Sequence, residues 1–488
     1  MRSSSLAVVL IAAVCVGCAS NGEQAADSTT AITTVATTAI TASTSTWPAT
    51  ISTTAPEHDC FWSPGITRGA INTQYPDANA TYWYSAYTVP TGATVRLNGN
   101  FAHARYQSFG SYAFDLAANE VGVAVDVLAD IDIEPLTGST NPFRVGARRD
   151  AVNRQYTVTL QQSGVPSAPI ATTSDQNVLY TLPDAAPPAT SPVQQEIIYR
   201  VYVPDNARDL TGDSGLPNVE VTLADGSVIT GSDACAALHA DSSAPANGAG
   251  LLSADTYRQL VSLGDANTHP AHNPPTWLRF FNPRFNVLAS FWTGTSYEPQ
   301  ITALDKSIRK GFYANINTDY GVAAVNRALG DGPRDHNVLV LRGKAPTSPR
   351  TGDGEPVMTD AQVRYWSICQ NESPVTTRVS DCLYDEQIPA DADGMYTVVV
   401  SLAEDRPSNA TIACGVAWMA WGDGDGVDRP QAGTLILRHM LPAESFTNTW
   451  AHVTEPGTEQ AVLGAYLPQG EYRAQSAFEQ RGCPPTKQ

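Results

Sequence analysis

Apolar and polar residues alternate along many short segments of this chain. These segments are rich in β-branched and aromatic residues and are bounded by Gly, Pro, Asn and Asp, as is typical of strands with one buried face. The clearest are TVRLNGNF (94–101), VAVDVLADIDI (123–133), QYTVTL (155–160), EIIYRVYV (196–203), VEVTL (219–223), VLVLR (338–342), MYTVVVSL (395–402) and TLILRHML (434–441). Many short strands joined by polar turns predict a mainly β protein made of antiparallel β-sandwiches or jelly rolls.

Short motifs recur in the same order in the two halves of the chain. The first series is INTQY (71–75), VRLNG (95–99), RYQSF (105–109), YTV (156–158) and IIYRVYVP (197–204), and the second is INTDY (316–320), VLVLRG (338–343), RYWSI (364–368), YTV (396–398) and LILRHMLP (435–442). The matched positions lie 238 to 259 residues apart, which suits a duplicated domain and is too long for a solenoid repeat. We expect two homologous sandwich halves in which Arg105 matches Arg364 and Arg200 matches Arg438.

The two predicted sandwiches, 57–230 and 305–488, are separated by a segment of different character at 231–304. SADTYRQLVSLGD (253–265) begins with a capping Ser and carries apolar residues at helical spacing, and NVLASFW (286–292) is a second candidate helix. Aromatic residues are concentrated here, namely Phe280, Phe281, Phe285, Phe291 and Trp292. They either pack into the seam between the sandwiches or line an apolar ligand pocket there.

The N-terminus has the features of an export signal. A cation at Arg2 and an apolar run precede Gly17 and Cys18, and the run is too short for a membrane span. Residues 1–17 resemble a bacterial lipoprotein signal that is cut before a lipidated cysteine, although Cys15 stands where Leu is usual; ordinary secretion is the alternative. Residues 18–56, rich in Ala, Ser and Thr, predict a disordered tether. We expect an exported protein, anchored by lipid at Cys18 to the outer face of the cell membrane.

Six further cysteines suggest three disulfides in an exported chain. They are Cys60, Cys235, Cys369, Cys382, Cys414 and Cys483. Cys369 and Cys382 lie in adjacent predicted strands and could pair across a hairpin. Cys414 and Cys483 could fasten the C-terminal tail, but the spacing alone leaves the connectivity open.

The charge of the chain excludes one class of partner. Its formal net charge is −19 and its pI is near 4.7, whereas nucleic-acid binding requires a basic face. No nucleic acid is therefore expected as a partner.

Motifs of the second half resemble the C-terminal member of a widespread tandem pair of bacterial domains of unknown function. RYWSICQ (364–370), GVAWMAWG (415–422) and TLILRHMLP (434–442) follow that family's YWS, NWLP and LRLY-x-P pattern. Trp366, Trp418, Arg438 and Pro442 are at matching positions, while Ala417 replaces the family's Asn and His439 and Met440 alter the LRLY motif. ARYQSF (104–109) and STNPFRVGARR (139–149) are similar to uncharacterised exported actinobacterial proteins. The resemblance implies a tandem β-sandwich and no particular activity.

Familiar catalytic motifs give little support for an enzyme. No GxSxG, HExxH, Walker or dinucleotide motif occurs, so no cofactor, metal site or catalytic residue is assigned. The GDSG sequence at 212–215 is interpreted as a polar turn, because triads are defined by geometry. His269 and His272 lie in a Pro-rich loop, and the acidic stretches GDGDGVD (422–428) and PADADG (389–394) lack the distal Glu of an EF-hand.

The sequence DIDIE offers the most distinctive polar cluster. If it is a strand, Asp130, Asp132 and Glu134 share one face. Such acids require cations, and the candidates are Arg105, Arg148, Arg149 and Arg200. The cluster is either an ion-pair lattice that holds the sandwiches together or a polar ligand site made of Arg105, Tyr106, Asp130 and Asp132.

These observations leave three hypotheses for function. The first is a surface-tethered binding or interaction module for a carbohydrate or lipid-like ligand. The second is an exported glycan hydrolase that uses an Asp/Glu pair, and the third is a structural wall protein. Two carboxylates facing one cleft, with one raised pKa, would favour the enzyme.

Overall fold

A computed structural model describes residues 58–483, except for 116–119, 163–176, 183–192, 244–249, 294–300, 302, 305, 307–310, 331 and 333–335. The folded chain from Ala55 onward is one compact unit. The predicted signal peptide, Cys18 and the tether lie outside the described residues.

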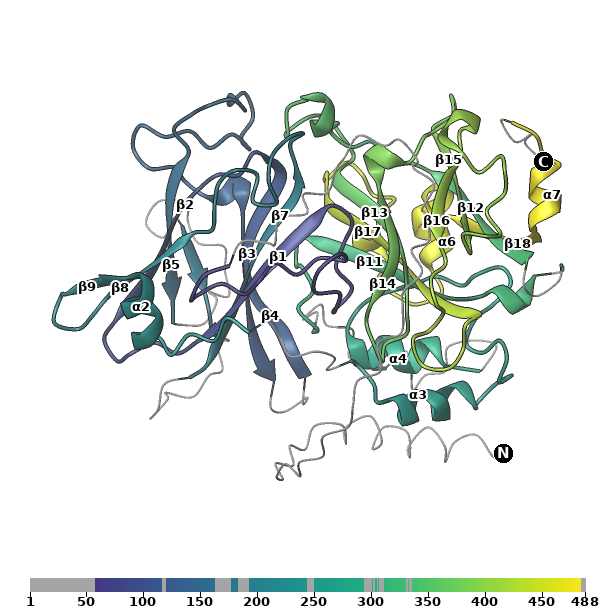
Figure 1. Cartoon of the computed structure of the whole chain (residues 1–488), viewed down its shortest axis with the longest axis horizontal. Helices are drawn as coiled ribbons and strands as arrows, with labels where there is room; N and C mark the ends of the chain where they lie inside the picture. Colours follow the sequence, from purple (N-terminus) through teal and green to yellow (C-terminus); the bar gives the residue numbers. More distant parts are fainter. Residues whose placement is uncertain are drawn as a thin grey trace, which may run out of the picture. The chain divides into compact units, whose positions relative to one another are not determined.

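The first half is a sandwich of two sheets (Figure 1). One sheet has the strand order β1-β7-β3-β4 and the other β6-β5-β2-β8-β9. The strands are β1 (Ala80–Tyr87), β2 (Thr94–Asn100), β3 (Ala104–Asp115), β4 (Glu120–Ala129), β5 (Gln155–Gln161), β6 (Val178–Tyr180), β7 (Gln195–Pro204), β8 (Asn218–Thr222) and β9 (Val228–Thr230).

The second half repeats this topology. Its sheets have the orders β10-β11-β17-β13-β14 and β16-β15-β12-β18, so that β11, β17, β13 and β14 take the places of β1, β7, β3 and β4. Both halves even place one parallel pair at the same position, β5 with β6 and β15 with β16. The strands are β10 (Leu278–Arg279), β11 (Thr318–Asn326), β12 (Asn337–Lys344), β13 (Val363–Asn371), β14 (Val379–Tyr384), β15 (Met395–Ser401), β16 (Ala417–Ala420), β17 (Ala432–Pro442) and β18 (Gln469–Ala474). The predicted mainly β fold with two like halves is confirmed.

Strand register fixes which residues of the two halves are equivalent. Arg200 on β7 faces Tyr82 on β1, and Arg438 on β17 faces Tyr320 on β11. Arg105 and Arg364 are likewise the second residues of β3 and β13. The predicted matches of these arginines are therefore confirmed.

The match of INTQY with INTDY is wrong as a structural equivalence. Tyr320 of INTDY corresponds to Tyr82, whereas Tyr75 of INTQY has Tyr313 as its counterpart: both lie in extended segments before the first strand and have positive φ angles of 55° and 58°. The similarity of the two pentapeptides is coincidental.

The repeated glycines also have a structural reason. A Cβ at Gly99 would lie 2.6 Å from the hydroxyl oxygen of Tyr156, and one at Gly343 would lie 3.0 Å from that of Tyr396. These tyrosines lie directly across from the glycines in the β2–β5 and β12–β15 pairs. Each glycine lets a buried tyrosine ring lie flat across its strand.

Strands β7 and β13 are buried on both faces, unlike the alternating strands β2 and β5. Their sheets bury one face within their own sandwich and the other against the opposite half. A small aromatic cluster joins the halves there, including Tyr106, Tyr202, Tyr365 and Met440. This explains why their sequences are nearly continuous apolar runs interrupted by single polar residues.

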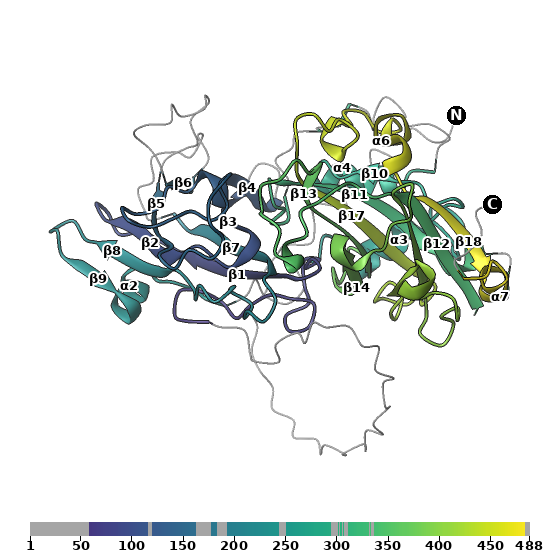
Figure 2. The same cartoon turned by 90° about the horizontal axis from the view of Figure 1, so that it is seen from above.

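Helices occur mainly in the segment between the halves. They are α2 (Gly231–Ala237), α3 (Ala254–Val261) and α4 (Pro283–Ser290), with α6 (Glu459–Leu463) and α7 (Gln475–Glu479) near the C-terminus. The predicted Ser cap of α3 is present, since Ser253 accepts from the Thr256 N–H at 3.1 Å. Helix α2 packs in the core of the first half through Ala234 and Cys235. Figures 1 and 2 place α3 and α4 with the second half.

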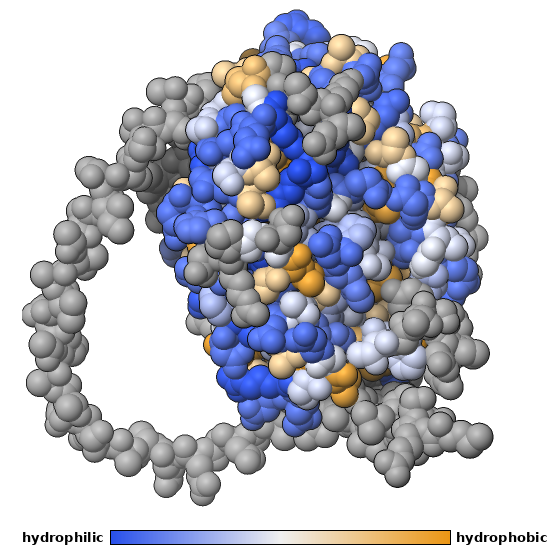
Figure 3. Space-filling model, turned by 90° about the vertical axis from the view of Figure 1, so that its right-hand side faces the viewer, coloured by the Kyte–Doolittle hydropathy of each residue, from blue (hydrophilic) through white to orange (hydrophobic). Residues whose placement is uncertain are grey.

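The described residues contain three disulfides. They join Cys60 to Cys235, Cys369 to Cys382 and Cys414 to Cys483. The two pairs proposed from spacing are present, and three disulfides indicate an oxidising, extracytoplasmic environment. Among the helices of the described residues, none has the length and apolarity needed to span a bilayer. The face that carries α7 and β18 is mostly hydrophilic, with scattered apolar residues (Figure 3).

A candidate binding cavity between the two halves

Two extended segments cross between the halves. The first arm (residues 71–79) precedes β1 but bonds to the second half, where the Tyr75 N–H donates to Thr377 O at 2.8 Å. The second arm (residues 311–317) precedes β11 and bonds to the first half, where the Tyr313 N–H donates to Gly122 O at 2.9 Å. The exchange of arms places each arm over the buried sheet of the opposite half.

Each arm is held by the repeated arginine of the opposite half. Arg200 Nη2 donates to Tyr313 O at 2.8 Å, and Arg438 Nη2 donates to Tyr75 O at 2.8 Å. The guanidinium groups also lie over tyrosine rings, with Arg200 5.6 Å from the Tyr82 centroid. The planar fork of arginine suits this combination of carbonyl bonding and stacking.

A cavity of about 170 Å³ lies between the arms, the two buried sheets and the connector helices. Its lining is mainly apolar and aromatic, and it includes both repeated arginines. The principal lining residues are Ile66, Tyr75, Tyr82, Ile198, Arg200, Tyr257, Phe280, Val287, Phe291, Tyr313, Asn315, Tyr320, Val322, Ile436 and Arg438. The predicted pocket lined by connector aromatics at the seam is therefore present in part, through Phe280 and Phe291. Phe281 and Phe285 pack together in a separate cluster, with ring centroids 5.0 Å apart.

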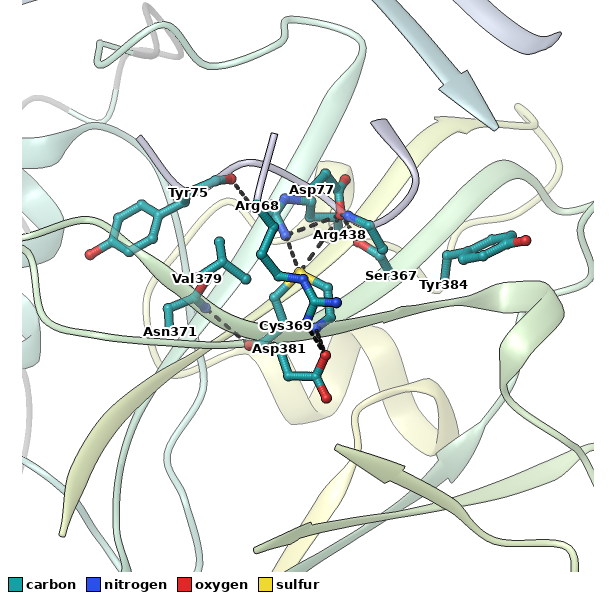
Figure 4. Close-up of a disulfide and its surroundings, with 12 residues drawn as sticks. Arg68, Tyr75, Asp77, Ser367, Cys369, Asn371, Val379, Asp381, Tyr384 and Arg438 are labelled. Atoms are coloured by element: carbon teal, nitrogen blue, oxygen red, sulfur yellow. Dashed lines mark hydrogen bonds and ion pairs between the residues drawn. A yellow bond between two sulfur atoms is a disulfide. The ribbon is translucent and has the colours of Figure 1, made fainter. Parts of the chain in front are cut away.

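Charge in the cavity wall is cationic. Arg438 is paired with Asp77 at 3.3 Å and also donates, at 2.9 Å, to the Cys369 sulfur of the Cys369–Cys382 disulfide (Figure 4). Arg429 donates to backbone carbonyls of the connector, among them His269 O at 2.8 Å. Among the described residues that line the cavity, none is an Asp or Glu. A catalytic pair of carboxylates is therefore not supplied by this described lining.

The tyrosines of the cavity are neutral hydrogen-bonding groups. Burial raises the pKa of Tyr82 to about 12, with the charge of Asp77 adding to the effect. Burial likewise raises the pKa of Tyr75, Tyr313 and Tyr320. Beside the cavity, burial raises the pKa of Glu196, which is opposed by hydrogen bonds from tyrosine hydroxyls. The tyrosine hydroxyls are uncharged and can orient a ligand by hydrogen bonding.

The structure places the sequence-predicted ligand residues elsewhere. Arg105, Tyr106 and Asp130 are fully buried between the halves, outside the cavity, whereas Asp132 is exposed. Arg105 donates both to Asp385, at 2.6 and 2.7 Å, and to Glu386. Their hydrogen-bonding capacity is used internally, which favours the ion-pair interpretation for these residues.

These ion pairs are reciprocal between the halves. Arg105 of the first half binds Asp385 of the second, and Arg364 of the second half binds Asp130 of the first at 2.9 Å. Each aspartate also accepts a backbone N–H within its own half, Asp130 from Gln107 at 2.9 Å and Asp385 from Trp366 at 3.1 Å. Burial raises the pKa of both carboxyls, against the opposing charges of the arginines. The four residues form one symmetric polar contact in the interface.

The expectation that DIDIE forms a strand is wrong. Strand β4 ends at Ala129, and Asp130–Asp132 forms a single 3₁₀ turn, as Asp385–Gln387 does after β14. The turn buries Asp130 and turns Asp132 outward, while Glu134 pairs with Arg144 at 2.7 Å. The three acids therefore do not share one face.

The other sequence candidates are structural in the described chain. Ser214 of the GDSG turn donates to Thr211 O and Gly215 O, as a polar turn does. Asp425 accepts from the backbone N–H groups of residues 427–429 and from the Tyr257 hydroxyl. Asp77, Cys369 and Cys382 lie close enough to hold a metal, but both sulfurs are used in a disulfide and offer no thiolate.

Sequence reasoning did not find most of the cavity. Its walls come from parts of the chain that are far apart in the sequence, and the arms carry no motif beyond their tyrosines. The available signals were the aromatic residues of the connector, of which Phe280 and Phe291 line the cavity, and the pair of arginines repeated in strands that are otherwise apolar.

The fold and the cavity define a tandem β-sandwich protein with a ligand-sized space between its halves. No protein-family model matches the sequence, and no curated protein matches it. A solved structure of an uncharacterised protein from Burkholderia cenocepacia is similar over 86% of this chain and 83% of its own, with 14% identity and a TM-score of 0.43. A solved structure of a Vibrio parahaemolyticus protein is similar over 81% of this chain and 89% of its own, with 9% identity and a TM-score of 0.35.

Proposed function

We propose that this protein is an exported binding protein that holds a small, largely apolar molecule in the cavity between its halves. The observation that carries the proposal is the cavity itself, which is lined by aromatic and aliphatic side chains and contains a few convergent polar groups. That combination is typical of small-molecule sites. An apolar cavity of about 150 Å³ is large enough to bind benzene, so the cavity here suits a ligand of one ring or a short branched chain.

The lining favours a lipid-like or aromatic molecule over a carbohydrate. A sugar presents many hydroxyls, and each needs a partner when it is buried. The walls formed by Ile66, Val287, Phe291 and Ile436 offer no such partners.

Filling the cavity is expected to abolish binding. Val287 is buried on α4 and lines the cavity, so Val287→Phe places a ring where the ligand would lie. Binding of benzamide and of toluene is measured by calorimetry and by the shift in melting temperature. A ligand at a hundred times its Kd raises the stability by about 2.7 kcal/mol, which Val287→Phe should remove.

A matched control is Val228→Phe, because Val228 on β9 is 57% exposed and lies outside the cavity lining. This variant should bind like the parent. Equal binding by the parent and Val287→Phe would contradict the proposed site.

We further propose that the protein is anchored by lipid at Cys18. The proposal rests on the signal-like N-terminus and the following Ala/Ser/Thr-rich segment. Cys18→Ser is expected to move the protein from the membrane fraction to the medium or to leave it unprocessed, as measured by fractionation and by mass spectrometry of the N-terminus. Processing of the parent that globomycin does not inhibit would contradict the anchor.

A further inference from the structure

The two repeated arginines differ in one respect that the symmetry of the halves makes visible. Arg438 faces Ser367 in the β13–β17 pair, and Arg200 faces Ser108 at the same place in the β3–β7 pair. All four side chains are buried, each 3% exposed or less. The two sites should therefore have the same need for hydrogen-bond partners.

In the second half, the carboxylate of Asp77 is the hydrogen-bond acceptor for both Arg438 and Ser367. Its Oδ1 accepts from Ser367 Oγ at 2.6 Å and from Arg438 Nη1 at 3.3 Å. Figure 4 shows Asp77 of the first arm between Ser367 and Arg438. One carboxylate thus neutralises the buried cation and satisfies the neighbouring hydroxyl.

In the first half, the corresponding arm position holds Asn315 in place of an aspartate. The equivalence is set by the backbone, because Asp77 N–H donates to the Tyr82 hydroxyl at 3.0 Å and Asn315 N–H donates to the Tyr320 hydroxyl at 2.9 Å. The Asn315 side chain accepts from the Asn317 N–H at 3.0 Å and donates to the Tyr106 hydroxyl. It therefore carries no charge and is used within its own arm and by Tyr106.

One donor of Arg200 is consequently left without a partner. Among the described residues, Arg200 Nη1 has no hydrogen-bond acceptor, whereas Ser108 bonds to the Tyr106 hydroxyl. The counterpart Arg438 Nη1 bonds to Asp77. A second acceptor is also missing, since the position of Cys369, whose sulfur accepts from Arg438, is occupied by Gly110 in the first half.

A buried guanidinium without an anion is unfavourable in a folded protein. Arginine stays protonated at any physiological pH, and burying a charge is costly unless it is paired. Arg200 has stacking tyrosines and the bonds to Tyr112 and Tyr313, but these groups are neutral. Arg200 and Asn315 both line the cavity, so the guanidinium forms part of the wall of the ligand space, whereas Ser108 is fully buried and outside the lining.

We propose that the ligand is a small organic monoanion, an aromatic or branched-chain carboxylic acid of about the size of benzoate. Its carboxylate takes at Arg200 the place that Asp77 takes at Arg438. Its apolar part lies against the connector side of the cavity, at Phe280, Val287 and Phe291. This inference rests on the proposed function and specifies the class of ligand.

The test compares charged and neutral molecules of equal shape on the same protein. Calorimetry is run with benzoate against benzamide, and with phenylacetate against phenylacetamide. Because a hydrogen bond to a charged group contributes more than a neutral one, the acids are expected to bind at least about tenfold more tightly than the amides.

Asn315→Asp is the decisive variant, because it installs at the second arm the carboxylate that the first arm already has. It should fold with a melting temperature at or above that of the parent, lose binding of the acids and keep binding of the amides. Arg200→Gln should bind acids and amides about equally. Val287→Phe should bind neither kind.

The outcomes separate the two levels of the proposal. Amides that bind as tightly as acids overturn the anionic ligand and leave the apolar cavity standing. Acid binding that is unchanged in Asn315→Asp overturns the placement at Arg200. No binding of any probe by the parent overturns both proposals.

Discussion

Arg438→Met is expected to lower the free energy of unfolding by about 3 to 5 kcal/mol, because it leaves the buried carboxylate of Asp77 without its cation. Asp77 is 3% exposed and cannot regain water without moving the first arm. The substitution also removes the donor to Tyr75 O, so the arm loses its attachment to β17. Arg438→Lys keeps the charge but not the planar fork, and it should recover only part of the loss.

Arg200→Met is the matched control, since it has the same burial and the same strand position in the other half. It leaves no carboxylate unpaired among the described residues. The expected loss in the free energy of unfolding is therefore that of the hydrogen bonds to Tyr112 and Tyr313, about 1 kcal/mol each. Urea unfolding of the three variants beside the parent gives the comparison. An Arg438→Met variant as stable as Arg200→Met would show that Asp77 does not depend on the ion pair.

Loss of the Cys60–Cys235 disulfide is expected to have a comparable effect, about 5 kcal/mol. The bond closes a loop with a sequence separation of 175, and the chain-entropy model gives a larger stabilisation for a longer loop. It also fastens α2 to the start of the folded chain, where Phe61 and Trp62 enter the core of the first half. Cys60→Ser/Cys235→Ser should lower the urea midpoint accordingly.

The hairpin disulfide provides the internal comparison. Cys369 and Cys382 are 13 residues apart, for which the same model gives about 3 kcal/mol. Replacing both by Ser should cost less than replacing the long-range pair. The reverse order of the two midpoints would mean that local packing, and not loop closure, dominates the contribution of these bonds.

The secondary structure and the duplication followed from the sequence because they depend on local patterns. Alternation placed Val95, Leu97, Val158 and Leu160 on buried faces, where they lie. The Ser253 cap and the motif order needed no knowledge of distant contacts. The segment after β4 was the exception, since a 3₁₀ turn there depends on Asp130 meeting Arg364 from the other half, and alternation alone continues the strand.

The sequence by itself determined the two like sandwiches, the cysteine set and the repeated arginines, because each leaves a periodic or countable trace in the order of residues. Only the tertiary structure decided what the arginines contact. Asp77 and Asn315 are equivalent only because the two arms exchange between the halves, and the ligand space exists only where these arms, two sheets and the connector meet. Such convergence of segments hundreds of residues apart has no periodicity, so the sequence indicated only the connector aromatics of the cavity wall and not the arms and sheets that complete it.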